Sequence, residues 1–523
     1  MNFGLFDLVG PIMHGPSSNH TGGANRIGYL ARRLMGGTPQ QITYGFHPIF
    51  MRIFTGHRTH VALTAGCLGM REYDTDSTQA LRMAKERDIT LSYTPVEEEA
   101  DRNTMRIMGD WDGVHWVING ISPGGGAVVI SRINGMDTQF DGSCYLYYWM
   151  ADQLEGAENI PACLEELHIP LVRRYRGEWE GRDQFCAEFS RALTQGERDA
   201  LTACLNPRGP VLQRDVEPLH PFTERAGSRP LFNSFAQLLE ACRDHPLIDL
   251  VYQYEENHSG QSREAILEQG LKIVEILRES IEVGLRGSNP LICGFCSGSD
   301  GKAVYQWGES GRSLAGMVFN EALANSLALA ERSASSGRVV AAPTSGAAGT
   351  LPGTLFAVAR RCGADDKKLA EAFLVSALLG ILVGKDGSFA GSVAGCQVEI
   401  GVGAAMAAGA SVWLAGGTPR QVVDGTVIAL ANCFGLTCDQ PASPVEVPCI
   451  KRNAMGASVA LMGAELALAG VVSAMPADDV VAGFLDIQKR MPEGTHGGCL
   501  GGLAVSPYGA EMRARWDEIL KRD

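Results

Sequence analysis

The sequence has no run of lysine and arginine of the kind that follows a nucleic-acid backbone. Charged residues make up only 20% of its 523 residues, and the formal net charge is −14. An acidic chain without a basic cluster is a poor partner for phosphate groups, so we expect no nucleic acid among its partners. The apolar content of 45% is that of a globular chain rather than a disordered one.

The sequence also lacks the usual signals of export and of membrane insertion. The N-terminal stretch MNFGLFDLVGPIMHG has no basic residue ahead of its apolar ones, so we expect no secretory signal. The most apolar segment, residues 400–417, consists largely of Gly and Ala, whose small side chains gain little from transfer into lipid. We therefore expect a tightly packed buried helix rather than a membrane span, and a cytoplasmic protein.

Cysteine is abundant, with 14 in the chain. Scattered cysteines of a large cytosolic chain are usually small buried hydrophobic residues rather than disulfide partners. Cys293 and Cys296 have the C-x-x-C spacing of a metal or redox pair, which is a weak signal without a second pair. The cysteines expected to be buried core residues are Cys67, Cys163, Cys186, Cys204, Cys242 and Cys362.

Three other cysteines stand apart because of their surroundings. They are Cys396 in SVAGCQVEIG, Cys438 in FGLTCDQPASP and Cys449 in VEVPCIKRNAMG. The three prolines between the last two forbid a continuous helix and indicate a fixed loop that can aim two thiolates at one point. Three thiolates are one fewer than a closed metal site takes, and they leave one position open for Lewis-acid chemistry. The spacing alone leaves a purely structural role for these cysteines open.

Periodicity predicts an α+β multidomain chain. Residues 1–140 alternate short strands with helices, and the strand pattern HWVINGISPGGGAVVISRI is broken by a glycine turn. Residues 141–215 follow the order strand, helix, strand, strand, helix, strand of a small ferredoxin-like module. Residues 216–230 are rich in proline and charge and are predicted to form a linker. Residues 231–523 are predicted to be mostly helical.

Several motifs resemble those of the iron–sulfur-dependent L-serine dehydratases. GPSSNHT at residues 15–21 is similar to the GPSSSHT signature of that family's beta chain. AAPTSGAAGTLPGTLFAV, GCQVEIG, GLTCD and VEVPCIKRNAMGAS match its alpha chain. The resemblance implies a beta-chain-like domain over residues 1–140 and an alpha-chain-like catalytic domain over residues 231–523. Residues 141–215 lie where one branch of the family has an ACT-type regulatory module, and their element order does not decide whether they bind an effector.

The resemblance also implies a cofactor and a reaction. The cofactor is a [4Fe–4S] cluster held by Cys396, Cys438 and Cys449, with one iron left free to bind the β-hydroxyl of an amino-acid substrate. The reaction is elimination of water from L-serine, after which the imine hydrolyses to a 2-keto acid and ammonia. Some members end in a cysteine that caps the open iron. This sequence ends differently, and we expect Cys499 to be a core residue.

Two polar loops are the expected substrate ligands. The GPSSNHT loop enters a helix, whose N–H groups and dipole attract a carboxylate, although Asn19 or Thr21 can equally serve as its cap. The loop APTSGAAG offers N–H groups and hydroxyls, or is simply a turn that begins a helix. The residues predicted to bind substrate are Ser17, Ser18, Asn19, Thr21, Arg58, Thr344, Ser345, Gly346, Ala347, Asp386 and Ser388.

The general base is expected among residues that can hold a proton near neutral pH. His20, His57 and Lys385 are the predicted catalytic residues, and His60 and His496 are further candidates. A single histidine is more often a structural hydrogen-bonding residue than a base, so the assignment stays open.

Departures from the family pattern bear on the substrate. Arg58 and His60 replace the Gly and Asp of GHGTD, Asp386 and Phe389 replace the Asn and Ile of NASISG, and Asn19 replaces a Ser. A site built for one polar group discriminates strongly against its analogues. We therefore predict a lyase acting on L-serine or on a related β-hydroxy or β-substituted amino acid.

Other functions stay open at this point. The chain can be a family member with a different, non-serine substrate, or a non-catalytic iron–sulfur sensor or amino-acid-binding protein. A pyridoxal-phosphate lyase is disfavoured, because no lysine lies in a matching glycine-rich phosphate context. The sequence is compatible with a homodimer but does not specify one.

Overall fold

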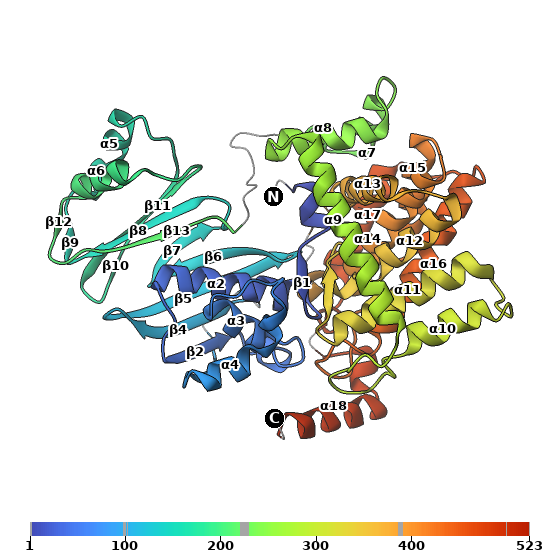
Figure 1. The fold of residues 1–523 in the computed structure, drawn as a ribbon, viewed down its shortest axis with the longest axis horizontal. Helices are drawn as coiled ribbons and strands as arrows, with labels where there is room; N and C mark the ends of the chain where they lie inside the picture. The colour runs from blue at the N-terminus through green and yellow to red at the C-terminus, as the bar shows by residue number, and fades with distance from the viewer. Residues whose placement is uncertain are drawn as a thin grey trace.

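The computed structural model describes residues 3–97, 101, 103–219, 230–384, 387, 391–497 and 499–521. Three groups of elements follow one another along the chain (Figure 1). They are a six-stranded sheet with its helices, a four-stranded sheet with two helices, and a large helical part. The α+β class and the helical C-terminal region are those predicted from the sequence.

The six-stranded sheet has the order β3-β2-β4-β5-β6-β7 and is antiparallel except between β2 and β3. The apolar residues of α2 recur at helical spacing, and this side of the helix is buried. The predicted glycine turn joins β5 to β6, where residues 124–126 all have positive φ. The bounds are β2 Gln41–Phe46, β3 Thr90–Pro95, β4 Met105–Trp111, β5 Val114–Gly124, β6 Ala127–Ile133, β7 Met136–Phe140, α2 Ala24–Met35, α3 Thr59–Cys67 and α4 Ala80–Glu86.

The four-stranded antiparallel sheet has the order β10-β11-β8-β13, with α5 and α6 packed on its buried face. The predicted order strand, helix, strand, strand, helix, strand is observed, with the short pair β9 and β12 added. The bounds are β8 Tyr145–Ala151, β9 Gln153–Leu154, α5 Ile160–Glu166, β10 Leu171–Trp179, β11 Arg182–Phe189, α6 Gln195–Leu205, β12 Pro207–Arg208 and β13 Leu212–Val216.

The predictions for the scattered cysteines are partly wrong. Cys163 of α5 and Cys204 of α6 form a disulfide, because the two helices pack side by side and bring their Cα atoms to 6.5 Å. Cys362 is exposed and Cys242 is only partly buried, whereas Cys67 and Cys186 are buried as expected.

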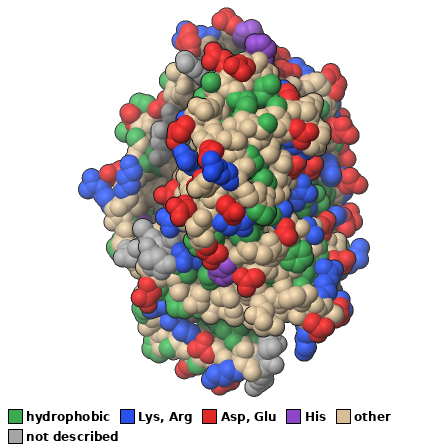
Figure 2. All heavy atoms as spheres, turned by 90° about the vertical axis from the view of Figure 1, so that its left-hand side faces the viewer, with side chains coloured by type: hydrophobic (Ala, Val, Ile, Leu, Met, Phe, Trp, Pro, Cys, Tyr) green, Lys and Arg blue, Asp and Glu red, His purple; other side chains and the backbone are tan. Residues whose placement is uncertain are grey.

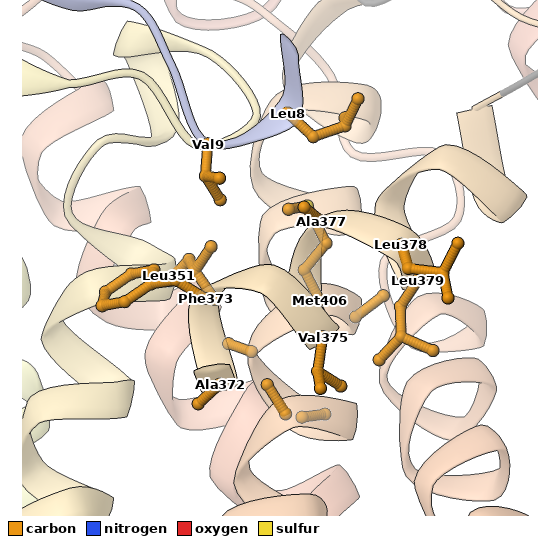
Figure 3. Close-up of a cluster of buried hydrophobic side chains, with 14 of the residues drawn as sticks. Leu8, Val9, Leu351, Ala372, Phe373, Val375, Ala377, Leu378, Leu379 and Met406 are labelled. Atoms are coloured by element: carbon orange, nitrogen blue, oxygen red, sulfur yellow. The ribbon is translucent and has the colours of Figure 1, made fainter. Parts of the chain in front are cut away.

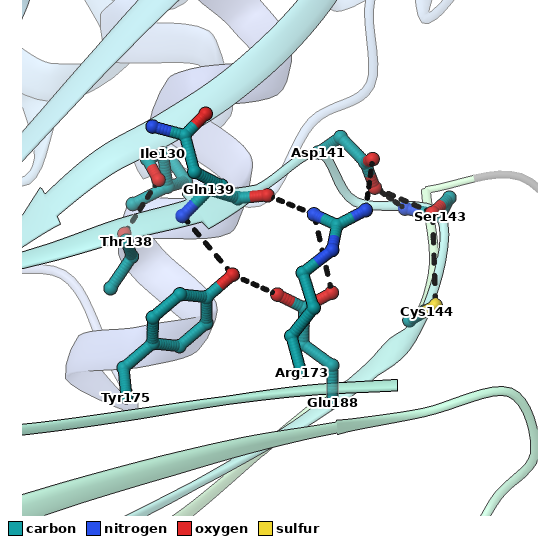
Figure 4. A network of polar contacts seen from close by, with 9 residues as sticks. All are labelled: Ile130, Thr138, Gln139, Asp141, Ser143, Cys144, Arg173, Tyr175 and Glu188. Carbon is teal, nitrogen blue, oxygen red and sulfur yellow. Dashed lines mark hydrogen bonds and ion pairs between the residues drawn. The ribbon is translucent and has the colours of Figure 1, made fainter. Parts of the chain in front are cut away.

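A polar network joins the two sheets (Figure 4). Arg173 and Tyr175 of β10 both reach Gln139 of β7, where the Arg173 guanidinium donates to the Gln139 carbonyl and the Gln139 N–H donates to the Tyr175 hydroxyl. Tyr175 also donates to the buried carboxylate of Glu188 at 2.6 Å, and Arg173 pairs with Asp141 at 3.3 Å. The four-stranded module is therefore tied to the edge strand of the larger sheet.

The outer surface of this end of the molecule carries acidic and basic side chains interspersed with one another (Figure 2). Several are ion-paired within the small module, such as Arg191 with Glu197 at 2.6 Å and Arg208 with Glu155 at 2.6 Å. Pairs as exposed as these contribute little to stability.

The helical part is built around α13 and α14, whose many small and aliphatic side chains let neighbouring helices pack closely (Figure 3). The stretch Gly395–Leu414 is long and apolar enough to cross a membrane, but 89% of its apolar window is buried inside the molecule, which confirms the predicted buried helix. The bounds are α7 Phe235–Ala241, α8 Leu247–Ser259, α9 Arg263–Leu285, α10 Asp300–Glu309, α11 Gly316–Ala334, α12 Thr350–Cys362, α13 Asp366–Gly384, α14 Gly391–Leu414, α15 Pro419–Ala431, α16 Cys449–Leu468, α17 Ala477–Arg490 and α18 Pro507–Leu520.

The N-terminal segment packs into this helical part rather than onto the sheets. Strand β1 (Ile12–His14) pairs with β14 (Arg338–Val340), and α1 (Leu5–Leu8) lies against α13. Leu8 and Val9 join the same buried cluster as Phe373 (Figure 3). This packing holds the polar loop that follows β1 against the helical part.

Candidate functional site

A cavity of about 70 Å³ lies between the N-terminal and C-terminal parts of the chain. The N-terminal part contributes the loop after β1 and two histidines, and the C-terminal part contributes the three singled-out cysteines. The residues that line the cavity include Ser17, Ser18, Asn19, His20, Phe50, His57, Asn103, Gly346, Cys396, Glu399, Cys438, Gln440, Cys449, Arg452 and His496. The structure thus gathers motifs separated by more than 400 positions.

The three thiols reach the cavity from three different elements. Cys396 lies in α14, Cys438 in the loop after α15, and Cys449 at the first position of α16, and all three are buried. The hydrogen bond from Cys438 lowers the pKa of Cys396, and the same bond raises the pKa of Cys438. Nη1 of Arg452 lies 3.3 Å from the sulfur of Cys396 and adds positive charge beside it. These contacts favour the thiolate at Cys396.

A backbone kink places Cys396. Gly395 has φ 63° and ψ −167°, a region open essentially to glycine alone, and it interrupts the helical geometry of α14. A Cβ atom at Gly395 would lie 3.2 Å from Cβ of Cys438, which is tighter than ordinary contact. The same position therefore needs glycine both for its backbone angles and for the close approach of two of the thiols.

Cys438 is fixed by a short backbone pairing with a C-terminal segment. Its N–H donates to the carbonyl of Thr495 at 2.7 Å, and its carbonyl accepts from the N–H of Gly497 at 2.9 Å. In the described parts of the chain, no three His, Cys, Asp or Glu side chains are close enough together to hold one metal ion. The three thiols thus line the cavity without converging on a single point.

Two histidines form a hydrogen-bonded pair in the cavity wall. Nδ1 of His20 lies 3.1 Å from Nδ1 of His57, and Nε2 of His20 lies 3.2 Å from Oδ1 of Asn103. Burial lowers the pKa of His20 to about 4 and lowers that of His57 well below its ordinary value. Both rings are therefore neutral at pH 7, and each can accept a proton only by becoming a buried cation.

The loop after β1 holds His20 in a π-helical turn, Ser18–Gly23, that runs directly into α2. Ser17 is the cap, because its hydroxyl accepts from the N–H of His20 at 3.1 Å. The predicted caps, Asn19 and Thr21, make other contacts: Asn19 accepts from Gly126, and the Thr21 hydroxyl donates to the carbonyl of His57 at 2.7 Å. π-Helical turns are rare and are frequent at functional sites.

Glu399 was missed by the sequence analysis. It follows Cys396 by three positions on α14, so that both side chains lie on one face of the helix and both line the cavity. Its Oε1 accepts from the Thr344 hydroxyl at 2.9 Å, and burial raises its pKa to about 6. The spacing within GCQVEIG was the available signal.

Asn453 was also missed, and it holds the APTSGAAG loop in place. Its side-chain N–H₂ group donates to the carbonyls of Gly346 at 2.9 Å and Cys449 at 3.0 Å. Its Oδ1 accepts from the N–H groups of Gly349 and Thr350. One buried amide thus links this loop to the first turn of α16, where Cys449 lies.

The helical part of the chain matches a known protein family. The family described as serine dehydratase alpha chain matches residues 243–504. The chain belongs to this family. It is 34% identical over 287 residues to the probable L-serine dehydratase alpha chain of Bacillus subtilis (strain 168), covering 54% of this chain and 95% of the relative.

Two further alpha chains are similar to this member of the family. The L-serine dehydratase alpha chain of Peptoniphilus asaccharolyticus is 34% identical over 289 residues, covering 54% of this chain and 97% of the relative. The probable alpha chain of Latilactobacillus sakei is 42% identical over 197 residues, covering 38% of this chain and 94% of the relative. The chain is therefore an enzyme of the lyase class.

Three residues predicted to bind substrate make contacts within the protein and lie outside the cavity lining. The Ser345 hydroxyl donates to the carbonyl of Gly15 at 2.8 Å and so joins the two loops. Thr344 holds Glu399, and Ala347 is buried beside Cys396. None of these three lines the cavity, although the adjoining Gly346 does.

Other predicted residues lie apart from the cavity. Arg58 and Thr21 line a separate, smaller cavity. His60 packs between the rings of Phe54 and Tyr93, and burial lowers its pKa to about 4. Cys499 is buried outside the cavity lining, as expected. Lys385, Asp386 and Ser388 lie outside the described residues, so their predicted roles stay predictions.

Proposed function

We propose that this enzyme eliminates water from L-serine with the help of a [4Fe–4S] cluster held by Cys396, Cys438 and Cys449, to give a 2-keto acid and ammonia. The observation that carries the proposal is that three buried thiols from separate elements line one cavity together with a histidine pair. Relatives named L-serine dehydratase alpha chain support serine as the substrate.

The residues present fit an iron–sulfur cluster. The donor set is three soft thiolates, and in a cluster each cysteine binds its own iron, so the sulfurs need not converge on one point as they would around a single ion. Three protein ligands leave one iron without a cysteine. The chemistry that such a cluster supplies when bound is Lewis-acid activation of the β-hydroxyl as a leaving group.

The histidine pair is proposed to take the proton from the α-carbon. If Nε2 of His20 donates to Oδ1 of Asn103, then Nδ1 of His20 accepts the hydrogen bond from Nδ1 of His57. This tautomer leaves the lone pair of Nε2 of His57 available to accept a proton. His57 is therefore the proposed base, and His20 with Asn103 fixes its tautomer.

Two loops are proposed to bind the substrate carboxylate. Residues 17–19 and Gly346 line the cavity from opposite halves of the chain, and Asn453 holds the loop that contains Gly346 in place. Backbone N–H groups at the start of a helix favour a carboxylate. From the sequence alone, Arg58, Asp386 and Ser388 are also proposed to contribute to substrate selection.

Several wider assignments are proposed along with the reaction. Residues 1–140 are assigned to a beta-chain-like domain, residues 141–215 to an ACT-type module, residues 216–230 to a linker and residues 231–523 to the catalytic domain. The amino-acid substrate is the proposed small-molecule partner, with no nucleic acid or membrane, and a homodimer in the cytoplasm is proposed.

Anaerobic reconstitution with iron and sulfide tests the function. Steady-state keto-acid formation is measured with L-serine, L-threonine and larger β-hydroxy amino acids, and L-serine is expected to give the highest kcat/KM. If a different β-hydroxy amino acid gives the highest kcat/KM, that amino acid replaces L-serine as the proposed substrate, and the proposed elimination stands. Absence of keto acid from every substrate, with the cluster intact, would overturn the proposal.

A further inference from the structure

We propose that the carboxylate of Glu399 binds the α-ammonium group of the amino-acid substrate. The inference rests on the proposed function, because it concerns the orientation of an amino acid in the same cavity. Glu399 lies within the GCQVEIG motif, but the sequence analysis gave it no role.

The charges of the cavity lining favour a cationic ligand beside Glu399. Among the described residues that line it, Glu399 is the only Asp or Glu. The one arginine of the lining, Arg452, donates to Oδ1 of Asp439 at 2.7 Å, to the carbonyl of Thr437 at 2.5 Å and to the sulfur of Cys396 at 3.3 Å, and among the described residues its hydrogen bonds do not include Glu399. The charge of Arg452 acts on Glu399 only from a distance, and burial still raises the pKa of this carboxylate. A partly buried carboxylate without a hydrogen-bonded cation carries a desolvation cost, which the ammonium group of a substrate would offset.

The Glu399 carboxylate is held in a position where one of its oxygens is available to a ligand. Thr344 donates to Oε1 and fixes the rotamer, and no hydrogen bond to Oε2 is formed by the described residues. A Cβ atom at position 346 would lie 2.6 Å from Oε1 and 3.1 Å from Oε2. Glycine at this position therefore keeps the space beside both oxygens open.

Gly346 and Glu399 together suit the two charged groups of an α-amino acid. Gly346 belongs to the loop proposed to bind the substrate carboxylate, and it lies directly beside the Glu399 carboxylate. The ammonium and carboxylate groups of an α-amino acid are attached to the same carbon atom. A carboxylate-binding loop next to an anionic side chain is thus complementary to both charged groups at once.

The E399Q variant tests this role, because it keeps the shape and removes the charge. The KM for L-serine is compared with the inhibition constant of 3-hydroxypropanoate, which has the same carboxylate and hydroxyl but no ammonium group. We expect the KM for L-serine to rise about 30-fold or more and the inhibition constant to change less than about twofold. Iron and sulfide contents should equal those of the unsubstituted protein.

A matched control is E321Q, the same change at a carboxylate of the helical part that pairs with Arg360 outside the cavity. It should leave both constants unchanged. The inference would be overturned if E399Q weakened the binding of L-serine and of 3-hydroxypropanoate equally. It would also be overturned if the KM for L-serine stayed unchanged while kcat fell, and that result would assign Glu399 to proton transfer.

Two further results are also decisive. If E399Q forms no keto acid, L-serine binding is measured by calorimetry, and affinity equal to that of the unsubstituted protein would overturn the inference. If the unsubstituted, cluster-containing protein neither binds nor converts L-serine, the proposed function fails and this inference fails with it.

Discussion

Gly395 shows how much of the site depends on one residue. Its backbone angles are those of a glycine-only region, and its missing side chain lets Cys396 and Cys438 approach each other. A larger residue here must either move the kink or separate two of the proposed cluster ligands. The cysteines are thus necessary for the site, but the glycine beside them decides where they point.

The G395A variant should lose both stability and bound iron. We expect the free energy of unfolding to fall by about 1–3 kcal/mol because of backbone strain, and the iron content after anaerobic reconstitution to fall below half. The matched control is G416A, which also has positive φ, at 82°, but meets no atom within 4 Å of a new Cβ. G416A should retain full iron content, and full iron content in G395A would contradict the assigned role.

His57 is expected to act in turnover and not in cluster binding. The H57A variant should lower kcat by about 10²- to 10⁴-fold while iron and sulfide contents stay unchanged, because the proposed base is removed and the thiols are not touched. H60Q is the control, since His60 is packed between aromatic rings away from the cavity. A kcat for H57A within threefold of the unsubstituted enzyme would remove His57 from the mechanism.

The sequence predicted the residues with local signatures and missed those defined by tertiary contacts. Motif and residue type pointed to Cys396, Cys438, Cys449, His20 and His57, and all five line the cavity. Asn453 was missed because the hydrogen bonds of its side chain are made across space, to a loop about a hundred positions earlier and to its own helix. Glu399 was missed although it lies three positions after Cys396, because no expected function required a carboxylate there.

At the scale of elements, the contact between β10 and β7 is one of several that join the small module to the rest of the chain, beside the packing of β13 on α2. The buried centre of the contact between β10 and β7 is Glu188, whose carboxylate accepts from Tyr175 and lies 3.8 Å from the Arg173 guanidinium (Figure 4). Burial raises the pKa of Glu188 to about 7. The network is therefore expected to respond to pH.

The sign of this response follows from linkage. The folded pKa of about 7 is above the ordinary value of 4.5, so the folded chain binds this proton more tightly than the unfolded chain does. The stability that protonated Glu188 contributes is fully present below about pH 4.5 and is lost as the pH rises through 7. The window of loss is therefore pH 4.5 to 7.

E188Q should remove this pH dependence, because the amide resembles the protonated acid. We expect it to be more stable than the unsubstituted protein by about 1–3 kcal/mol at pH 8 and equally stable near pH 4.5. Chemical denaturation across this range measures the difference. A variant that loses stability between pH 4.5 and 7 as steeply as the unsubstituted protein would contradict the assignment.

Elements themselves were easier to predict than their partners. The alternation of residues 141–215 gave the correct order of strands and helices, because each strand and helix has its own periodicity. The pairing of β1 with β14 joins segments more than 320 positions apart, and nothing local encodes it. The disulfide between Cys163 and Cys204 was missed for the same reason, since it follows from the packing of α5 on α6.

At the scale of the whole molecule, the site exists only where the two parts of the chain meet. Ser443 shows the contact directly: its hydroxyl donates to the carbonyl of Ile53 at 2.8 Å and accepts from the N–H of Gly56 at 3.0 Å. Ser345 makes a similar link to Gly15. The thiols and the histidines therefore share one cavity only in the assembled chain.

Removal of the cluster should destabilise the assembled chain. A group that binds the folded chain and not the unfolded one raises the melting temperature, so chelator-treated protein should melt several degrees lower than reconstituted protein. Calorimetry under anaerobic conditions measures both forms. The triple variant with serine at all three cysteines is the control, and its melting temperature should not change on reconstitution. Equal melting temperatures for loaded and stripped unsubstituted protein would contradict a bound cluster.

The central claim is that three cysteines hold a four-iron cluster and leave one iron open to the substrate. Mössbauer spectroscopy of protein reconstituted with ⁵⁷Fe, recorded with and without L-serine, tests it most directly. The account predicts a four-iron cluster in which one iron site changes its spectrum on addition of L-serine while the other three do not. The claim would be contradicted by a spectrum without a four-iron cluster, or by a four-iron cluster in which no iron site changes its spectrum on addition of L-serine.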